Sequence, residues 1–241
     1  MIGKIVPRRL ITPTRYSGEC GNLVVIERWR YTTSHPRDMA EELIQAHAHE
    51  KVMPYLHLPV QSGSDRVLEV MNRKHTKDFY LDLIDRFRAA RPDIAFSSDF
   101  IVGYPGETED DFEETLSLVR RVKYAMAYSF KYSRRPGTPA AALEDQIPEA
   151  VKVARLARLQ ALLLEQQVAF NRSKVGTRQR ILLSKKGRHP GQLIGRTPFL
   201  QSVYVIAPER LIGQSVDVDI TGASQNSLTG VVVIEDEQLC A

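Results

Sequence analysis

The sequence predicts an α/β protein in which a parallel sheet with covering helices is followed by a small antiparallel β-barrel. Over residues 27–147, strand-like and helix-like segments alternate in units of about 30 to 40 residues, a pattern typical of parallel strands joined by right-handed crossovers. From residue 175 the pattern changes to short β-rich runs separated by Gly, Pro, Asn and Ser, which is typical of a small barrel or sandwich.

The first part of the chain is expected to contain four strands and the helices between them. The expected strands are residues 27–36, 53–60, 94–104 and 125–133. The expected helices are residues 36–49, 65–71, 76–91 and 108–122. The third helix is the most regular, because Phe79, Leu83, Ile84 and Phe87 fall on one face and Pro92 ends it.

Two further helix signals fix the boundaries of the later segments. Thr108 followed by Asp111 resembles a capping box, and Pro148 opens a long helix that reaches about residue 172. We therefore expect an unassigned segment at 1–26, a partial α/β barrel at 27–147, a linking helix at 148–172 and a β-barrel at 173–241.

Composition and cysteine content exclude several classes of protein. Hydrophobic residues make up 43% and charged residues 26%, as in ordinary globular proteins. No apolar run approaches the roughly 20 residues that cross a bilayer, and the N-terminus is a poor secretory signal, so we expect a cytoplasmic protein that does not interact with membranes. The two cysteines, Cys20 and Cys240, exclude a disulfide framework and a metal site built from cysteines of this chain alone.

Positive charge is concentrated in the middle of the second half. The net charge is +4, yet residues 150–208 hold eleven lysines and arginines against one acid, Glu165. Such a block favours a polyanion as partner. A solvated, charge-rich helix and loop is the alternative that charge alone leaves open.

Polar clusters follow four of the expected strands. They are Thr32 to His35, Gln61 to Ser64, Gly103 to Thr108 and Ser133 to Thr138. Because ligands of parallel α/β folds bind at the carboxyl ends of the strands, these loops predict one rim of a binding site. Each cluster alone is more typical of an ordinary turn than of a site.

Four single residues in the expected α/β part are candidates for a role in binding or packing. His57 alternates with Leu56 and Leu58, so it either points into the barrel or is a satisfied core histidine. Asp99 lies within an apolar strand and needs a partner or a ligand. His35 is expected in a loop, and the single Trp29 is expected to pack.

Several long runs resemble the radical-SAM tRNA methylthiotransferases, and within them the branch that modifies isopentenylated adenosine next to the anticodon. The runs are RYTTSHPRDM, MPYLHLPVQSGSDRVLEVMNRKHT, SSDFIVGYPGETEDDF, FKYSRRPGTPAA and QSVDVDITGASQNSLTG. They keep the family's order over about residues 27–236. The resemblance implies the later half of a radical-SAM (TIM-like) barrel and the whole of the small RNA-binding β-barrel called the TRAM domain.

The resemblance also implies cofactor and RNA sites. S-adenosyl-L-methionine would be held by Ser34, His35, Gln61, Ser62, Asp99 and Gly103. The basic block would contact tRNA through Arg172, Lys174, Arg178, Arg180, Lys185, Lys186, Arg188 and Arg196.

One departure from the family is severe. Radical-SAM enzymes ligate a 4Fe–4S cluster through a Cys-x-x-x-Cys-x-x-Cys loop, and this sequence has no such spacing. We therefore expect an inactive C-terminal fragment, truncated or frameshifted upstream, unless a separate chain supplies the missing half. Other possibilities are a tRNA-binding module without catalysis, a chain that folds poorly, and the related branch that modifies a ribosomal protein.

Overall fold

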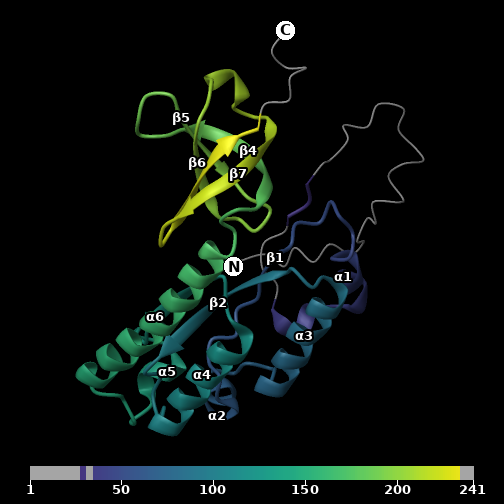
Figure 1. Cartoon of the computed structure of the whole chain (residues 1–241). Helices are drawn as coiled ribbons and strands as arrows, with labels where there is room; N and C mark the ends of the chain where they lie inside the picture. Colours follow the sequence, from purple (N-terminus) through teal and green to yellow (C-terminus); the bar gives the residue numbers. More distant parts are fainter. Residues whose placement is uncertain (1–27, 31–34, 234–241) are drawn as a thin grey trace.

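The computed structural model describes residues 28–30 and 35–233, which form a helix-covered parallel sheet, a long helix and a closed β-barrel (Figure 1). The sheet contains β1 (Tyr55–His57), β2 (Ala95–Val102) and β3 (Met126–Lys131) in the order β1-β2-β3. Both pairs are parallel, which confirms the predicted α/β class. Proline flanks β1 on both sides, at Pro54 and Pro59, and limits it because proline has no N–H to donate.

Half of the first expected strand lies outside the described residues. Of that segment only residues 28–30 and 35–36 are described, and Trp29 makes a single parallel bridge with Val52. The helix expected at 36–49 consists of two pieces, the 3₁₀ turn η2 (Pro36–Asp38) and α1 (Glu41–Ala46). The helix breaks because Met39 and Ala40 leave the helical region, and this turns Met39 into the core, where it is 7% exposed.

Four more helices surround the sheet. They are α2 (Asp65–Val70), α3 (Lys77–Ala90), α4 (Glu109–Val122) and the short α5 (Pro139–Ala142). The predicted capping box at the start of α4 is confirmed, since Thr108 Oγ1 accepts from the N–H of Asp111 at 3.2 Å and the Asp111 carboxylate accepts from the N–H of Thr108 at 2.7 Å.

The main core lies between the helices and one face of the sheet. Phe96, Phe100 and Val102 of β2 are at most 1% exposed there, and Leu83, Ile84 and Phe87 of α3 pack against them.

The α3 face differs from the prediction at its first position. Phe79 is 39% exposed, and Tyr80 is the buried residue. The Tyr80 hydroxyl donates to the Leu58 carbonyl at 2.9 Å and lies 3.0 Å from the Tyr124 hydroxyl, so the buried phenol is hydrogen-bonded.

The second part of the chain begins with α6 (Glu149–Arg172), which packs against β3, and continues into five barrel strands. These are β4 (Arg178–Lys186), β5 (Gln192–Arg196), β6 (Ser202–Ile206), β7 (Ser215–Ala223) and β8 (Ser227–Val232). They close in the order β4-β5-β6-β8-β7. Every pairing is antiparallel except that of β6 with β8, which is parallel.

Strand β5 is interrupted by a glycine. Its glycine, Gly195, weakens the β pattern, yet the barrel requires it. A Cβ at that position would lie 2.4 Å from Ile181 Cγ2 and 2.8 Å from the Leu182 carbonyl oxygen.

The β-barrel contacts the amino-terminal end of the parallel sheet. Tyr55, Ala95 and Ala125, at or next to the starts of β1, β2 and β3, form a small cluster with Phe199 of the barrel. In Figure 1 the barrel lies at one end of the molecule, and β2 runs away from it toward α5. The strand ends that carry the rim loops therefore lie opposite the barrel. Within the described residues, no helix is both long and apolar enough to span a membrane.

Candidate functional site

One face of the parallel sheet is turned away from the helical core. Successive side chains of a strand point to opposite faces, so the residues that alternate with the core residues share the open face. The pairing register places on it Tyr55 and His57 of β1, Ser97, Asp99 and Ile101 of β2, and Met126, Tyr128 and Phe130 of β3.

The polar residues of this face are joined through Ser97. Its Oγ lies 2.6 Å from the Tyr55 hydroxyl and 2.7 Å from Nδ1 of His57. Nε2 of His57 lies 3.5 Å from Oδ2 of Asp99, and these two side chains are 21% and 29% exposed. His57 therefore points to the open face, where Ser97 satisfies its Nδ1, and Asp99 lies beside its Nε2.

Two arginines lie near this polar group. Burial lowers the pKa of Arg73, and nearby Asp99 acts in the opposite direction. The guanidinium carbon of Arg30 lies 5.9 Å from the centre of the Tyr55 ring. Burial also lowers the pKa of Arg30, and the neighbouring Arg28 lowers it further. The open face therefore has positive charge beside it.

The residues expected to hold S-adenosylmethionine are distributed over several environments. Ser34 lies outside the described residues. Gln61 is 7% exposed with φ of 77°, and its N–H donates to the Asp99 carbonyl at 2.9 Å, so these two are neighbours. His35 caps η2 by accepting from the N–H of Arg37 at 3.3 Å, and its ring lies 5.2 Å from that of His75.

Ser62 and Gly103 shape the loops from the helical side. Ser62 is 1% exposed, and its Oγ lies 3.3 Å from Thr115 Oγ1 of α4. The N–H of Gly103 donates to both carboxylate oxygens of Glu107 at 3.0 Å. A Cβ at Gly103 would lie 2.2 Å from Lys152 Cγ, and φ is +69°, so glycine is required there. Neither residue contributes a side chain to the open face.

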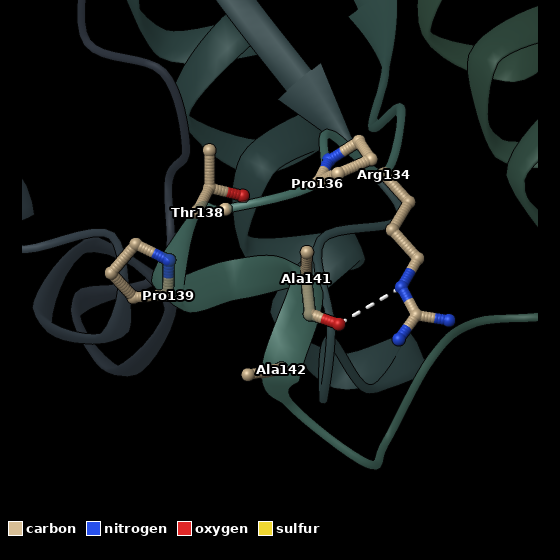
Figure 2. A pocket seen from close by; sticks show the side chains of 7 residues that line it. Arg134, Pro136, Thr138, Pro139, Ala141 and Ala142 are labelled. Atoms are coloured by element: carbon tan, nitrogen blue, oxygen red, sulfur yellow. Dashed lines mark hydrogen bonds between the residues drawn. The ribbon is translucent and has the colours of Figure 1, made fainter.

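The loop after β3 borders a cavity of about 820 Å³ (Figure 2). In this loop, Arg134 Nε donates to the Ala141 carbonyl at 2.9 Å and closes the loop onto α5. Pro136, Thr138 and Pro139 complete one side of the cavity. The fourth predicted polar loop is thus an open, proline-rich pocket at the carboxyl end of the last strand.

The eight basic residues expected to contact RNA are not equally available. Arg178, Arg180 and Lys186 form ion pairs with Asp219, Asp217 and Glu209 respectively. Arg196 donates to the Leu200 carbonyl at 3.0 Å.

Lys174 lies between two aromatic rings, with Nζ 4.6 Å from the centre of Phe170 and 3.9 Å from that of Phe199. Arg172, Lys185 and Arg188 are exposed, and within the described part of the chain their side chains have neither an ion pair nor a hydrogen bond.

Sequence patterns missed the contacts that join the barrel to the sheet. Arg28 Nη2 donates to the Arg180 carbonyl at 2.6 Å, and Arg30 Nη2 donates to the Thr197 and Pro198 carbonyls at 3.2 and 3.0 Å. Because every residue has a backbone carbonyl, the type of the accepting residue does not reveal such a bond in the sequence.

Asn171, at the end of α6, was also missed. It is 4% exposed, and its Nδ2 donates to the Ser224 and Gln225 carbonyls at 3.0 and 2.9 Å.

Comparisons with protein families match both parts of the chain. The Radical SAM superfamily profile matches residues 13–119, and the TRAM domain profile matches residues 172–233. Among solved structures, coproporphyrinogen III oxidase from Escherichia coli, described as a radical SAM enzyme, aligns with a TM-score of 0.46 and 15% identity over 85% of this chain and 51% of that one. That likeness is too weak to carry an argument.

Curated relatives carry the name tRNA-2-methylthio-N(6)-dimethylallyladenosine synthase. The protein of Sphingopyxis alaskensis is 63% identical over 204 residues, which cover 84% of this chain and 46% of the relative. That of Rickettsia felis is 53% identical over 233 residues, with coverages of 96% and 52%. That of Maricaulis maris is 62% identical over 206 residues, with coverages of 85% and 45%. The chain spans about half the length of these relatives.

The parallel sheet and the profile match place the chain in the radical SAM superfamily, with a TRAM domain as its second part. The sequence identities of 53–63% to the curated relatives then identify the family within this superfamily. The chain belongs to the tRNA methylthiotransferase family and corresponds to the carboxyl-terminal part of its members.

The family implies an iron–sulfur cluster and S-adenosylmethionine, and the described residues fit these two cofactors differently. Both cysteines of the chain lie outside the described residues, which contain no group of three or more His, Cys, Asp or Glu able to hold a metal ion. The described residues therefore do not fit an iron–sulfur cluster. S-adenosylmethionine fits better, because Asp99 and His57 are partly exposed beside open aromatic surface.

Proposed function

We propose that this chain provides the later strands of the radical-SAM sheet and the tRNA-binding barrel of a cytoplasmic tRNA methylthiotransferase. The observation that carries the proposal is the union, in one chain, of a radical-SAM sheet and a closed TRAM barrel within sequence 53–63% identical to enzymes named for this activity. Residues 27–147, 148–172 and 173–241 would act as sheet unit, linking helix and RNA-binding unit.

We propose that S-adenosylmethionine binds at the rim end of the open face. When bound, it would supply the methyl group and the radical source of the reaction. Asp99, with its carboxylate 29% exposed, would accept hydrogen bonds from it, and His57 would keep that carboxylate in place. Gln61 and His35 would border the site with Ser34, while Ser62 and Gly103 would fix the loops.

The cluster must come from outside this set of residues. A ligand loop needs three cysteines, and the 241 residues contain two. We therefore infer that these 241 residues alone do not cleave S-adenosylmethionine and that activity requires the family's cluster-bearing half.

Anaerobic iron–sulfur reconstitution, followed by iron quantitation and an assay for S-adenosylmethionine cleavage, tests this inference. Neither a stoichiometric cluster nor cleavage is expected from the chain alone. A full complement of iron with cleavage would overturn the inference.

A second candidate function is tRNA binding without catalysis, which the cysteine count favours. The two candidates separate when the chain is mixed with a cluster-bearing amino-terminal half of a relative. Restored methylthiolation of tRNA supports the enzyme, whereas unchanged tRNA affinity with no modification supports the binding module. Fluorescence anisotropy with labelled tRNA at several salt concentrations measures binding in both cases.

A further inference from the structure

The β-barrel has few acidic residues, and all of those described are paired with cations. Within residues 173–233 they are Asp217, Asp219 and Glu209, and their partners are Arg180, Arg178 and Lys186 respectively. Two of these pairs join β4 to β7, because the strand register places Arg178 opposite Asp219 and Arg180 opposite Asp217. Opposite charges therefore cancel on the outer surface of β4 and β7, which gives a polyanion little attraction there.

The other three barrel strands, β5, β6 and β8, contain no acidic residue. Residues 187–208 and 220–233 hold neither Asp nor Glu, although the first of these ranges contains Arg188 and Arg196. Lys185, near the end of β4, lies opposite Ile194 of β5. Within the described part of the chain none of these three cations forms an ion pair, and Arg196 donates to the backbone carbonyl of Leu200. Unbalanced positive charge therefore borders these strands.

The pairing register fixes which side chains share the outer surface of the three strands. Val203 and Val205 of β6 are buried in the barrel core, so Tyr204 between them points outward and is partly exposed. Tyr204 lies between Ile194 of β5 on one side and Thr229 of β8 on the other. An aromatic ring therefore occupies the middle of this surface, which we call the acid-free face and define by Ile194, Arg196, Ser202, Tyr204, Ser227 and Thr229.

Cations lie at both ends of the acid-free face. At one end, Ser202 of β6 lies between Arg196 of β5 and Ser227 of β8. At the other end, Gln192 Oε1 of β5 accepts from the N–H of Arg188 at 3.1 Å, which holds the basic loop between β4 and β5 at the edge of the face. A chain of negative groups that crosses the tyrosine would therefore meet positive charge on either side of it.

We propose that the acid-free face binds single-stranded RNA, with the Tyr204 ring as a stacking platform for one base. The proposal rests on the proposed function, which takes tRNA as the ligand, and it names the side of the barrel that binds the RNA. Single strands are bound by positively charged surfaces that follow the phosphates and by aromatic rings on which bases stack. The hydroxyl groups of the face, on Ser202, Ser227 and Thr229, suit contacts to phosphate and sugar.

The same assignment removes two residues that the sequence predicts as RNA contacts. Arg178 and Arg180 hold β4 to β7 through their ion pairs with Asp219 and Asp217. Their positive charge is already balanced, so the RNA gains little from passing over that side of the barrel.

Photo-crosslinking of the full chain tests where the RNA lies. The probe is a uridine-rich single-stranded RNA that contains 4-thiouridine. Trypsin releases residues 197–210 as one peptide, because Arg196 and Arg210 precede its two cleavage sites, and this peptide carries Tyr204. Mass spectrometry should find the nucleotide adduct on it. Adducts confined to β4 and β7 would overturn the proposal.

Two substitutions of Tyr204 test the stacking itself. The Tyr204 hydroxyl makes no hydrogen bond within the described residues, so Tyr204→Phe keeps the ring and is expected to fold. In anisotropy titrations with labelled tRNA, Tyr204→Ala should bind about 5- to 100-fold more weakly than the wild type, and Tyr204→Phe within about twofold of it. Circular dichroism verifies that both variants are folded. Equal losses in the two variants would contradict a role for the ring.

A pair of charge variants compares the two sides of the barrel. Arg196→Gln removes a cation of the acid-free face and should lower the slope of log affinity against log salt by about 1. The control is the double variant Arg180→Gln and Asp217→Asn, which removes one ion pair between β4 and β7 without changing the net charge. Its slope should equal that of the wild type. The reverse result would place the RNA on β4 and β7.

The remaining outcomes separate this proposal from the proposed function. If the wild-type chain binds tRNA and Tyr204→Ala binds it equally well, the RNA uses another surface; this proposal is then wrong, and the proposed function stands. If the cluster-bearing half of a relative abolishes the crosslink while tRNA stays bound, that half covers the acid-free face, and the proposal is again overturned. If the wild-type chain binds no RNA at any salt concentration, both the proposal and the tRNA-binding part of the proposed function are refuted.

Discussion

The carboxylate of Glu107 and the guanidinium of Arg155 form an ion pair with an Oε1–Nη1 distance of 2.9 Å, and their side chains are only 2% and 8% exposed. Arg155 Nη1 also donates to the Glu107 carbonyl at 3.1 Å, and the Gly103 N–H donates to the same carboxylate. Burial raises the pKa of Glu107, while Gly103 and Arg155 act against it. The pair therefore fixes α6 to the loop that follows β2.

Replacing Arg155 with Met is expected to lower the free energy of unfolding by about 3–5 kcal/mol, because the Glu107 charge would remain buried without its partner. Urea unfolding followed by circular dichroism measures the change. Arg158→Ala is the matched control on the same helix. Its side chain is 48% exposed and pairs with exposed acids, so the expected loss is below about 1 kcal/mol. Equal losses in the two variants would contradict a special role for the buried pair.

Asn171→Ala should weaken the attachment of the β-barrel to α6. Besides its two bonds to backbone carbonyls, Asn171 Oδ1 accepts from Gln201 Nε2 at 2.6 Å. Removing these bonds leaves the Gln201 amide without its acceptor and the two carbonyls without this donor, at an expected cost of about 1–3 kcal/mol. Limited proteolysis should then cut between α6 and β4 sooner than in the wild type. Gln167→Ala, which removes an exposed bond to the same Gln225 carbonyl, is the control and should behave like the wild type.

Regular patterns explain what could be predicted from the sequence. Alternation of strands and helices predicted the parallel sheet, and the capping box at Thr108 and Asp111 was found where expected. The position of a carboxylate within an apolar strand drew attention to Asp99, which lies partly exposed beside His57. These features depend on local spacing or on the chemistry of one residue.

Other features depend on contacts between distant segments. Phe79 and Tyr80 are adjacent residues of α3. Only the position of the sheet relative to the helix decides that Tyr80, and not Phe79, is buried. The count of basic residues did not reveal which cations are already engaged, as Lys174 is by two aromatic rings. Arg30 escaped notice because its partners are backbone carbonyls of a segment more than 160 residues away.

His47 predicts a loss of stability in mild acid. Burial, with a smaller effect of Arg91, lowers the pKa of this fully buried histidine to about 4. A group with a lowered folded-state pKa stabilises the fold above its unfolded value, near 6.5, and this stabilisation is lost as the pH falls toward 4. Between pH 7 and pH 5 the free energy of unfolding should fall by about 1–2 kcal/mol from this residue.

The measurement is urea unfolding at the two pH values for the wild type and His47→Gln. The variant is less stable at pH 7 because its side chain fits the site against Phe87 less well, but its loss between pH 7 and pH 5 should be smaller by the stated amount. An identical pH dependence in both proteins would show that His47 is not responsible. His49→Gln, two residues away and exposed, is the control for changes in net charge.

The unequal environments of the basic residues predict two distinct effects on RNA binding. Lys185 and Arg188 are exposed with no ion pair within the described residues, so their combined replacement by Ala should lower the slope of log affinity against log salt by about 1–2. Lys174→Ala should leave that slope unchanged, because its ammonium group lies over Phe199 at 3.9 Å, and should instead destabilise the fold by about 1 kcal/mol. Anisotropy titrations with tRNA at four salt concentrations and urea unfolding separate the effects. If Lys174→Ala changed the salt slope as much as the double variant, its ammonium group would have to leave the aromatic rings on binding RNA.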